Sequence, residues 1–525
     1  MNRKEKIFGF LGTSKSSFLI IGVSSFVTAV ISYYIFIIDN YGCADAIFEG
    51  LYYYHNADWA LQSGRWAVRY LNLLIGQNIV MPLNIVLVIC ICVSVAVCIL
   101  KVKWNIKNQF FIVLIAGTMI VSPSIINQLE YAYMAISFSM SFLLSVVFYA
   151  LGDLDKIVCN LIAAIALAIS MGLYQSYLGS ACALILMGAV IQCIDGKKIS
   201  GIIKELMRYV VTGIAGCCLD ILIYRVDLYA RKLQEASRVR EFGIAGIVKS
   251  FWRTVKECYS IFVGYYNDIT FKRKYFFIVF GMVMLSVLLY EMVCMMKYNV
   301  IGAMFCVCIL LMLPMGMNVI HILIPYNGVT ELMQYQHVLI IPFGFALIDR
   351  IIEKIRVFCA IAAFWILMLS SGAVISLLCT YITTSNATFE GIRVSHEAVH
   401  TQTLLILSDV YSIDGYEPNV TSIVFVGFPK DSVVKNVMKP LFDAGITPYS
   451  NYSYWEDMNG IIKGRYWYLL NYCGIDSGYV SQDDYEQIVN SSEFDWMPIW
   501  PAKGSVAIIN DKAVVKLSNN PLENN

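Results

Sequence analysis

The sequence predicts a polytopic α-helical membrane protein with about eleven transmembrane helices, followed by an extramembrane C-terminal domain of α/β or α+β type. Three observations lead to this fold class. Only 14% of the 525 residues are charged, whereas soluble domains carry about a quarter. Apolar runs long enough to cross a ~30 Å hydrocarbon layer recur through residues 1–380. Residues 381–525 are instead polar and rich in Asn, Ser, Asp and Tyr.

The first predicted span runs from about Ser17 to Ile38 and follows the charged N-terminus MNRKEK. It is longer than the apolar core of a signal peptide and lacks a small-residue cleavage site, so we expect it to be retained. The further apolar runs lie at 79–100, 109–126, 132–150, 157–173, 177–194, 208–224, 275–295, 299–320, 335–348 and 357–380.

Lysine and arginine gather in alternate connections between these spans, which predicts a cytoplasmic N-terminus. The loop at 39–78 and the C-terminal domain then face outward. Residues 225–274 are an exception, because they are strongly basic and yet fall on the outer side. Their apolar residues recur at helical spacing, which is typical of an amphipathic helix in the membrane interface. A solvated connector is the other interpretation of this segment.

Charge and cysteine usage exclude some classes of function. The net charge of +1 gives no basis for nucleic-acid binding. Most cysteines lie inside apolar runs, where a thiol acts as a small hydrophobe, and none follows a zinc-site spacing. Only Cys473 lies beyond residue 380, so the C-terminal domain has no internal disulfide.

Local patterns predict three elements in the C-terminal domain. The run TSIVFVGF (421–428) is typical of a buried strand, and residues 431–445 of a helix that Gly445 ends. Residues 504–517 are typical of a hairpin with its turn at Asn510 and Asp511.

The outer loop at 39–78 contains the first candidate site residues. Asp45 and Glu49 are four residues apart, so a helix would place both carboxylates on one face. Asp39 lies at the exit of the first span. A carboxylate can take the proton of an attacking sugar hydroxyl, and the guanidinium of Arg65 matches phosphate oxygens. The other interpretation is that topology keeps these acids outside and that Arg65 reaches toward the interface.

Other candidates lie at later outer turns. Tyr174 and Gln175, in GLYQSYLG, offer hydrogen bonds to a sugar, or they form a simple turn between spans. Glu130 lies in NQLEYAY, and Lys503, in WPAKGS, offers a second positive charge for a phosphate. Asp220 lies inside a span, where a carboxylate needs a partner that the sequence does not identify.

These segments together resemble the serotype-converting O-antigen glucosyltransferases of bacteria and their phages, of the type II kind. The shared features are the acidic loop after the first span, Gly64-Arg65, Tyr174-Gln175, and the closing segment MPIWPAKGS (497–505). That family is similar to the GT-C class of integral membrane glycosyltransferases.

The resemblance implies a reaction that composition does not show. The donor would be undecaprenyl-phosphate-linked glucose, and the acceptor an O-antigen sugar on the periplasmic face of the bacterial inner membrane. Transfer would invert the configuration at the anomeric carbon. Asp45 would be the base, and Asp39 and Glu49 are the next candidates. Arg65 would contact the donor phosphate. Because Arg65 or Lys503 could neutralise the charge of this phosphate in place of a metal, we expect no obligatory metal and no cofactor. A flippase and a polyprenyl-phosphate glucose synthase would be functional partners. A transporter or flippase of lipid-linked sugars, an O-antigen polymerase and an acyltransferase remain alternatives.

Overall fold

The structure is a computed structural model that describes residues 15–39, 57–75, 81–236, 244–267, 273–323, 331–427, 436–439 and 461–519. The chain divides into two compact units. The first consists of Met1–Tyr34, Asn56–Leu129 and Met134–Ser385. The second consists of Ile35–His55, Glu130–Tyr133 and Asn386–Asn525.

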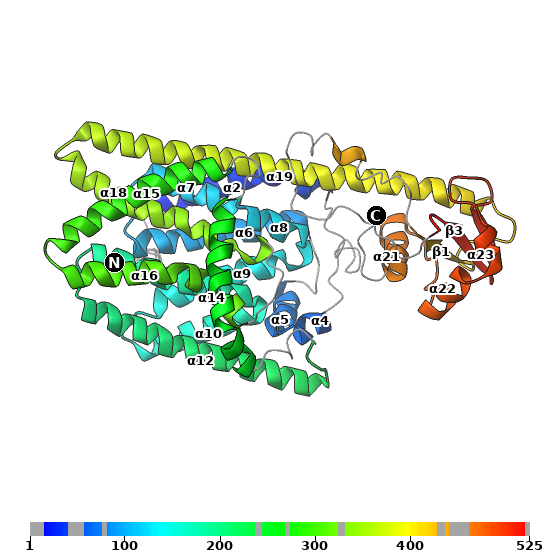
Figure 1. Cartoon of the computed structure of the whole chain (residues 1–525), viewed down its shortest axis with the longest axis horizontal. Helices are drawn as coiled ribbons and strands as arrows, with labels where there is room; N and C mark the ends of the chain where they lie inside the picture. Colours follow the sequence, from blue (N-terminus) through cyan, green and yellow to red (C-terminus); the bar gives the residue numbers. More distant parts are fainter. Residues whose placement is uncertain are drawn as a thin grey trace. The chain divides into compact units, whose positions relative to one another are not determined.

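Long apolar helices dominate the part of the chain that the structure describes, as predicted for a polytopic membrane protein (Figure 1). Within the described ranges, nine helical segments are long and apolar enough to cross a membrane. They include α2 (Lys15–Asp39), α6 (Pro82–Lys103), α7 (Gln109–Ile120) with α8 (Pro123–Glu130), α9 (Ala132–Leu151), α11 (Leu178–Ile194), α12 (Ile199–Arg231), α15 (Arg273–Met296), α16 (Val300–Met317) and α19 (Ala360–Tyr411).

The other two predicted spans correspond to shorter helices. Residues 157–173 form α10 (Ile157–Leu173), and residues 335–348 form the 3-10 helix η4 (Tyr335–Leu339) followed by α18 (Ile340–Arg356). Helices α10 and α18 have 17 residues each, about 26 Å at 1.5 Å per residue. The predicted count of eleven therefore exceeds the nine segments by these two.

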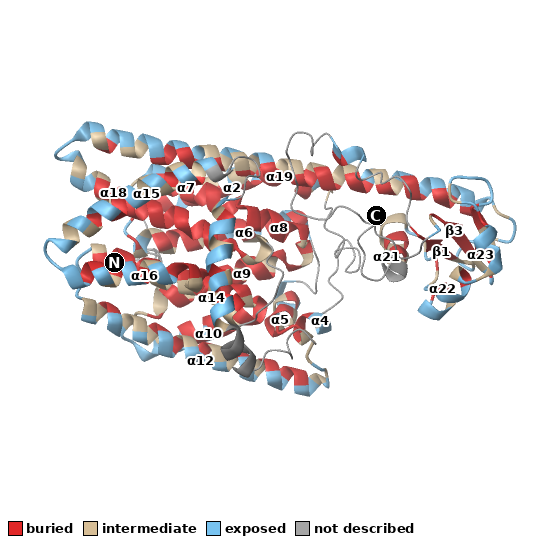
Figure 2. Cartoon of the chain, viewed as in Figure 1, coloured by how far each residue is buried: buried red, intermediate tan, exposed pale blue. Residues whose placement is uncertain are grey.

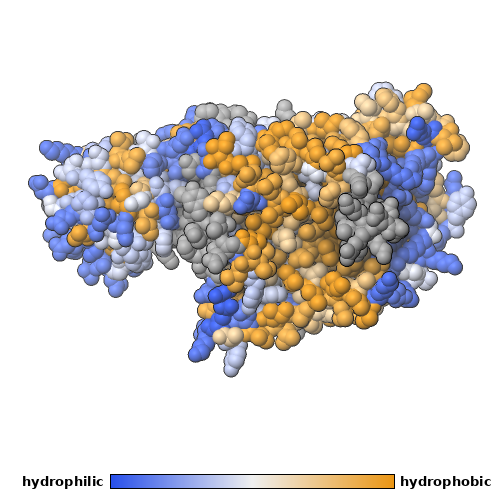
Figure 3. Space-filling view, turned by 180° about the vertical axis from the view of Figure 1, so that it is seen from behind, coloured by the Kyte–Doolittle hydropathy of each residue, from blue (hydrophilic) through white to orange (hydrophobic). Residues whose placement is uncertain are grey.

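Burial separates central from peripheral helices. In the most apolar window of Gln109–Glu130, 83% of the residues are buried, against 22% in that of Ile199–Arg231. Figure 2 shows the same contrast between α8 and the exposed outer face of α12. Exposed apolar side chains cover much of the helical surface, which is orange in Figure 3. Such a surface is stable when lipid covers it.

Ion pairs tie the basic connections together at one end of the helices. Arg350 contacts Asp195 through Nε and Nη2 at 2.8 and 2.9 Å, and its Nη1 donates to the carbonyl of Trp104 at 2.7 Å. Lys103 pairs with Asp153 at 2.8 Å in the same region of short loops. Connections that are far apart in sequence, near residues 104, 153, 195 and 350, therefore meet at one end of the helices.

The described part of the basic segment 225–274 is divided between separate helices, whereas its periodicity had suggested a single helix. Its first residues extend α12 to Arg231, where Lys232 adopts a left-handed conformation with φ 57° and ends the helix. A second helix, α14, spans Ile244–Asn267. It runs across the direction of α12 and α16 (Figure 1). Periodicity alone could not place this break, because both parts have helical spacing.

The second unit contains a three-stranded sheet in the order β1-β3-β2. Strand β1 (Ser422–Val426) is parallel to β3 (Lys512–Lys516), and β2 (Val506–Ile509) is antiparallel to β3. Asn510 and Asp511 have φ values of 50° and 58°, as a type I′ hairpin turn requires. The predicted strand and hairpin are confirmed, whereas most of the predicted helix at 431–445 lies outside the described residues.

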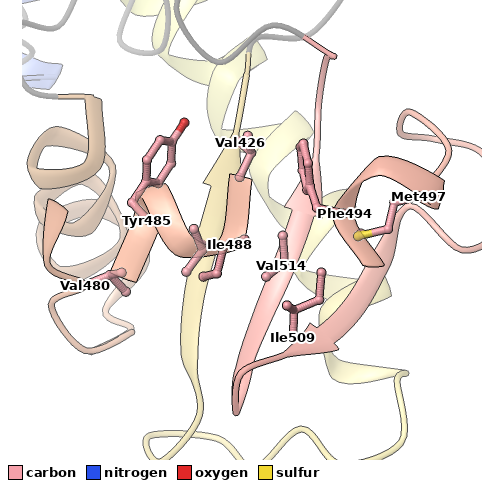
Figure 4. Packing of buried hydrophobic residues seen from close by; sticks show 9 residues of the cluster. Val426, Val480, Tyr485, Ile488, Phe494, Met497, Ile509 and Val514 are labelled. Carbon is pink, nitrogen blue, oxygen red and sulfur yellow. The ribbon is translucent and has the colours of Figure 1, made fainter. Parts of the chain in front are cut away.

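The described helices that accompany this sheet include α21 (Ile461–Cys473), α22 (Gln482–Val489) and α23 (Ser492–Trp496). Figure 4 shows the core that α22 and α23 share with the sheet, in which Ile488 of α22 and Phe494 of α23 pack with Val426 and Val514. The buried guanidinium of Arg465 donates to the carbonyls of Phe425 and Gly427 at 2.8 and 2.7 Å. These two bonds satisfy carbonyl groups at the end of β1.

Candidate functional site

The Gly64-Arg65-Trp66 segment forms a tight turn between two short helices, α4 (Ala57–Gln62) and α5 (Trp66–Ile75). The N–H of Gly64 donates to the carbonyl of Leu61, and that of Arg65 to the carbonyl of Ala60. Gly64 has φ +83°, a conformation that favours glycine. A Cβ at this position would lie 2.5 Å from Nε2 of Gln175, so a larger residue here would displace the Gln175 side chain.

The turn places Arg65 over the ring of Tyr174, with the guanidinium carbon 4.9 Å from the ring centroid. Tyr174 is only 2% exposed, so its face supports the arginine from beneath. Among the residues that the structure describes, the buried Nε of Arg65 has no hydrogen-bond partner and its guanidinium forms no ion pair. A half-buried cation without a counter-ion is suited to bind an anion.

Gln175 connects the same two segments directly. Its Nε2 donates to the carbonyl of Ser63 at 3.2 Å, one residue before the glycine of the turn. The two motifs that the sequence singled out, Gly64-Arg65 and Tyr174-Gln175, therefore meet in the first unit. They are about 110 residues apart in the chain.

Tyr174 and Gln175 lie at a break between α10 and η1 (Gln175–Tyr177), where Tyr174 has extended backbone. Serines of α9 donate hydrogen bonds to backbone carbonyls on both sides of this break. Ser141 donates to the carbonyl of Ser170 at 2.7 Å, and Ser145 donates to the carbonyl of Tyr177 at 3.0 Å. Non-helical backbone at membrane depth requires such internal partners, so these serines stabilise the break.

Helix α12 makes hydrogen bonds to residues on both sides of the Gly64-Arg65 turn. Nε1 of Trp66 donates to Oδ1 of Asp220 at 2.7 Å, and both residues are buried. The hydroxyl of Tyr224, one helical turn later, donates to the carbonyl of Gln62 at 3.2 Å. Asp220 thus has the partner that the sequence could not identify.

A glycine allows Trp66 to approach α10. A Cβ on Gly172 would lie 2.4 Å from the indole ring of Trp66. The indole is therefore fixed by close packing on one helix and by a hydrogen bond to another.

An aromatic layer lies next to Tyr174. The rings of Tyr174 and Tyr177 have centroids 6.1 Å apart, as do those of Tyr177 and Tyr335. Nε2 of Gln128 donates to the hydroxyl of Tyr177 at 2.6 Å. Tyr177 is buried, so the turn predicted at 174–177 is a packed element, in which only Gln175 is partly exposed.

None of the four acidic candidates belongs to the described part of the first unit. Asp45 and Glu49 lie outside the described residues. Asp39 and Glu130 belong to the second unit, where Glu130 is fully buried. Asp39 interacts electrostatically with Arg393 of α19, which itself pairs with Glu390 at 2.6 Å.

Lys503 lies in the turn before β2 and is exposed. Its role at a phosphate stays a prediction. Within the described ranges, no group of three or more His, Cys, Asp or Glu side chains is arranged to hold a metal ion.

The family model for the glucosyl transferase GtrII family matches residues 48–342, more than half of the chain. The chain belongs to the GtrII glucosyl transferase family. This confirms the resemblance that the sequence motifs indicated, and family membership implies glucosyltransferase activity. No curated protein matches the sequence.

The GtrII match includes the residues that form the turn and its support, from Arg65 to Gln175. It also includes Glu49 and Glu130, whereas Asp39, Asp45 and Lys503 lie outside it. Sequence reasoning missed the serines of α9 and the role of Trp66. Ser137, Ser141 and Ser145 recur every four residues in an apolar run, a spacing that indicates a polar stripe along one helix face.

Proposed function

We propose that this GtrII-family protein transfers a glucosyl group from a polyprenyl-phosphate-linked donor to a sugar of the O-antigen repeat. One observation carries the proposal: the half-buried guanidinium of Arg65, held over Tyr174, has no ion-pair partner among the described residues. A donor phosphate would supply the missing anion through bidentate hydrogen bonds.

The reaction is an inverting displacement. A carboxylate of the first outer loop takes the proton from the acceptor hydroxyl, and the acceptor oxygen forms the new bond to the anomeric carbon. The bond between that carbon and the phosphate oxygen breaks, and polyprenyl phosphate leaves with the electron pair. Asp45 is the proposed base, with Asp39 and Glu49 as the other candidates. Arg65 stabilises the charge that grows on the leaving phosphate.

The proposed location is the bacterial inner membrane, with a cytoplasmic N-terminus and a periplasmic C-terminal domain at 381–525. The ion-paired basic connections at one end of the helices support this orientation, because positive loops remain in the cytoplasm. Alkaline phosphatase, which is active only in the periplasm, provides the test. We expect a fusion at Ser237 to be active and a fusion at Gly196 to be inactive; the reverse would overturn the orientation.

A carrier or flippase of lipid-linked sugars and an O-antigen polymerase are the alternatives. A carrier uses charged groups within the membrane to bind its cargo. Asp220, a buried acid in the apolar helix α12, instead has a structural partner, because it accepts the indole N–H of Trp66 at 2.7 Å. This contact favours the transferase over a carrier.

The decisive experiment measures O-antigen mass. The chain is expressed in a bacterium that has a defined O-antigen, the synthase that makes the donor and the flippase that delivers it. We expect a gain of one hexose per repeat. Asp45→Asn should abolish this gain without lowering the amount of protein in the membrane.

Arg65→Ala should also abolish the gain, and Arg65→Lys should retain a fraction of it. Arg69→Ala is the matched control, because Arg69 lies on α5 and pairs with Asp58 at the surface. Unchanged mass with the wild-type chain and confirmed donor would contradict the proposal. A shift in chain-length distribution in that sample would indicate a polymerase.

A further inference from the structure

Helix α14 presents one buried face to the rest of the first unit. Thr254, Cys258 and Tyr265 are buried, and their spacing of four and seven residues places them on one side of the helix. Asn318 follows α16 and fixes the middle of this face, since its Nδ2 donates to the carbonyl of Cys258 at 3.1 Å.

The end of α14 is fixed in the same way. The ring of Tyr265 stacks on His337 of η4 with centroids 4.5 Å apart, and the hydroxyl of Tyr266 donates to the His337 carbonyl at 3.0 Å. The helix is therefore packed against its neighbours, which excludes the solvated connector that the sequence left open for this part of the segment.

The position of α14 along α16 gives its depth. Helix α16 has 18 residues, about 27 Å at 1.5 Å per residue, which is close to the ~30 Å thickness of the hydrocarbon layer. Helix α14 contacts Asn318, directly after the end of α16, and runs across it (Figure 1). Helix α14 therefore lies about one hydrocarbon thickness away from the first residue of α16, at the level where α16 would leave the hydrocarbon layer.

Two flanks border the buried face of α14. Trp252, Tyr259 and Val263 form the apolar flank and are 81%, 37% and 60% exposed. The other flank contains Ser260 and Arg253, and Arg253 pairs with Glu257 at 3.5 Å.

One hydrogen bond shows which way the apolar flank faces. The hydroxyl of Tyr259 donates to the carbonyl of Leu311 at 2.5 Å. Leu311 lies seven residues before Asn318, about 10 Å back along α16, and is itself exposed. The Tyr259 flank therefore faces the apolar body of α16, and the Ser260 flank faces away from it.

We infer that α14 lies in the interface of the bilayer and that its partner is the phospholipid surface. Trp252, Tyr259 and Val263 enter the boundary of the acyl chains, where tryptophan and tyrosine are preferred. Lys256 is exposed between the two flanks, where its ammonium group reaches the lipid phosphates. This inference does not depend on the proposed reaction.

Tryptophan quenching in nanodiscs tests the position. The fluorescence emission that is lost in Trp252→Phe is the contribution of Trp252. Trp496→Phe gives the contribution of Trp496 in the same way. Trp496 serves as the control because it is 88% exposed in the second unit. We expect phospholipids brominated in the upper acyl chain to quench the Trp252 emission by more than half, and aqueous acrylamide to leave it largely unchanged. Trp496 should show the opposite pattern. Acrylamide quenching of Trp252 to the level of Trp496 would overturn the inference.

A second variant tests the orientation. Ser260→Trp in the Trp252→Phe background places the probe on the polar flank. We expect this tryptophan to be quenched by acrylamide and not by brominated lipid. If brominated lipid quenches it as strongly as Trp252, α14 is immersed in hydrocarbon and the interfacial position is wrong.

Discussion

Nε1 of Trp66 donates a 2.7 Å hydrogen bond to Oδ1 of Asp220, although the two residues are 154 positions apart. The bond links the turn that carries Arg65 to a helix long enough to cross the membrane. Because Asp220 and Trp66 are both buried, neither group can exchange this partner for bulk water. The position of Arg65 therefore depends on a residue that is distant in sequence and does not itself touch the guanidinium.

This bond predicts a difference between two substitutions. Trp66→Phe leaves the Asp220 carboxylate buried without its donor, which should lower the free energy of unfolding by about 1–3 kcal/mol. Asp220→Asn keeps an oxygen acceptor and should cost less. Thermal unfolding in detergent and the O-antigen mass assay measure stability and transfer. Trp365→Phe on the exposed face of α19 is the control, and a Trp66→Phe variant as stable and active as this control would contradict the prediction.

Gly64→Ala should be more damaging than alanine at another glycine with positive φ. Gly64 and Gly196 have φ values of +83° and +78°, so both substitutions strain the backbone by a similar amount. Only at Gly64 would the new Cβ meet a neighbour, Nε2 of Gln175 at 2.5 Å. We expect Gly64→Ala to abolish most transfer and Gly196→Ala to retain it, as measured by hexose gain.

Shortening the neighbour provides the rescue for this pair. Gln175→Ala removes the atom that the new Cβ meets, so the Gly64→Ala/Gln175→Ala double variant should fold better than Gly64→Ala alone. Equal loss of folded protein in the single and double variants would show that the contact with Gln175 is unimportant.

Each serine of the α9 cluster that binds backbone near Tyr174 should contribute more to the free energy of unfolding than a serine on an exposed helix surface. Ser145→Ala removes the donor to the Tyr177 carbonyl, which lies at the break in the backbone. We expect it to destabilise the protein by about 0.5–1.5 kcal/mol and to reduce transfer, because the break positions Tyr174. Ser286→Ala is matched in chemistry, since Ser286 donates to Met282 one turn back on the exposed surface of α15. Equal melting temperatures for the two variants would argue against a supporting role for the cluster.

Arg350 should contribute more to stability than a neighbouring surface ion pair. Its guanidinium binds Asp195 and the carbonyl of Trp104, and its side chain is 12% exposed. Lys107 pairs with Glu353 at 2.8 Å, but both side chains are about half exposed. We expect Arg350→Ala to cost about 1–3 kcal/mol and Lys107→Ala less than about 1 kcal/mol. Urea unfolding in detergent compares the two variants.

Local patterns were sufficient for several features of this chain. Low charge and long apolar runs predicted a polytopic membrane protein, since hydropathy reports lipid exposure segment by segment. The Asn510-Asp511 pair predicted the hairpin because its two residues tolerate positive φ. Ordered motifs such as Gly64-Arg65 and Tyr174-Gln175 were enough to indicate the GtrII family, which the family match confirmed.

Only the tertiary structure decided how these segments meet. It brought Gln175 to the carbonyl of Ser63, gave Asp220 its partner in Trp66 and divided the basic segment between α12 and α14. The physical reason is that periodicity and propensity act over a few residues, whereas these contacts depend on which helices pack side by side. Gly172, for example, leaves room for the indole ring of Trp66. The sequence around a glycine does not reveal which distant residue packs against it.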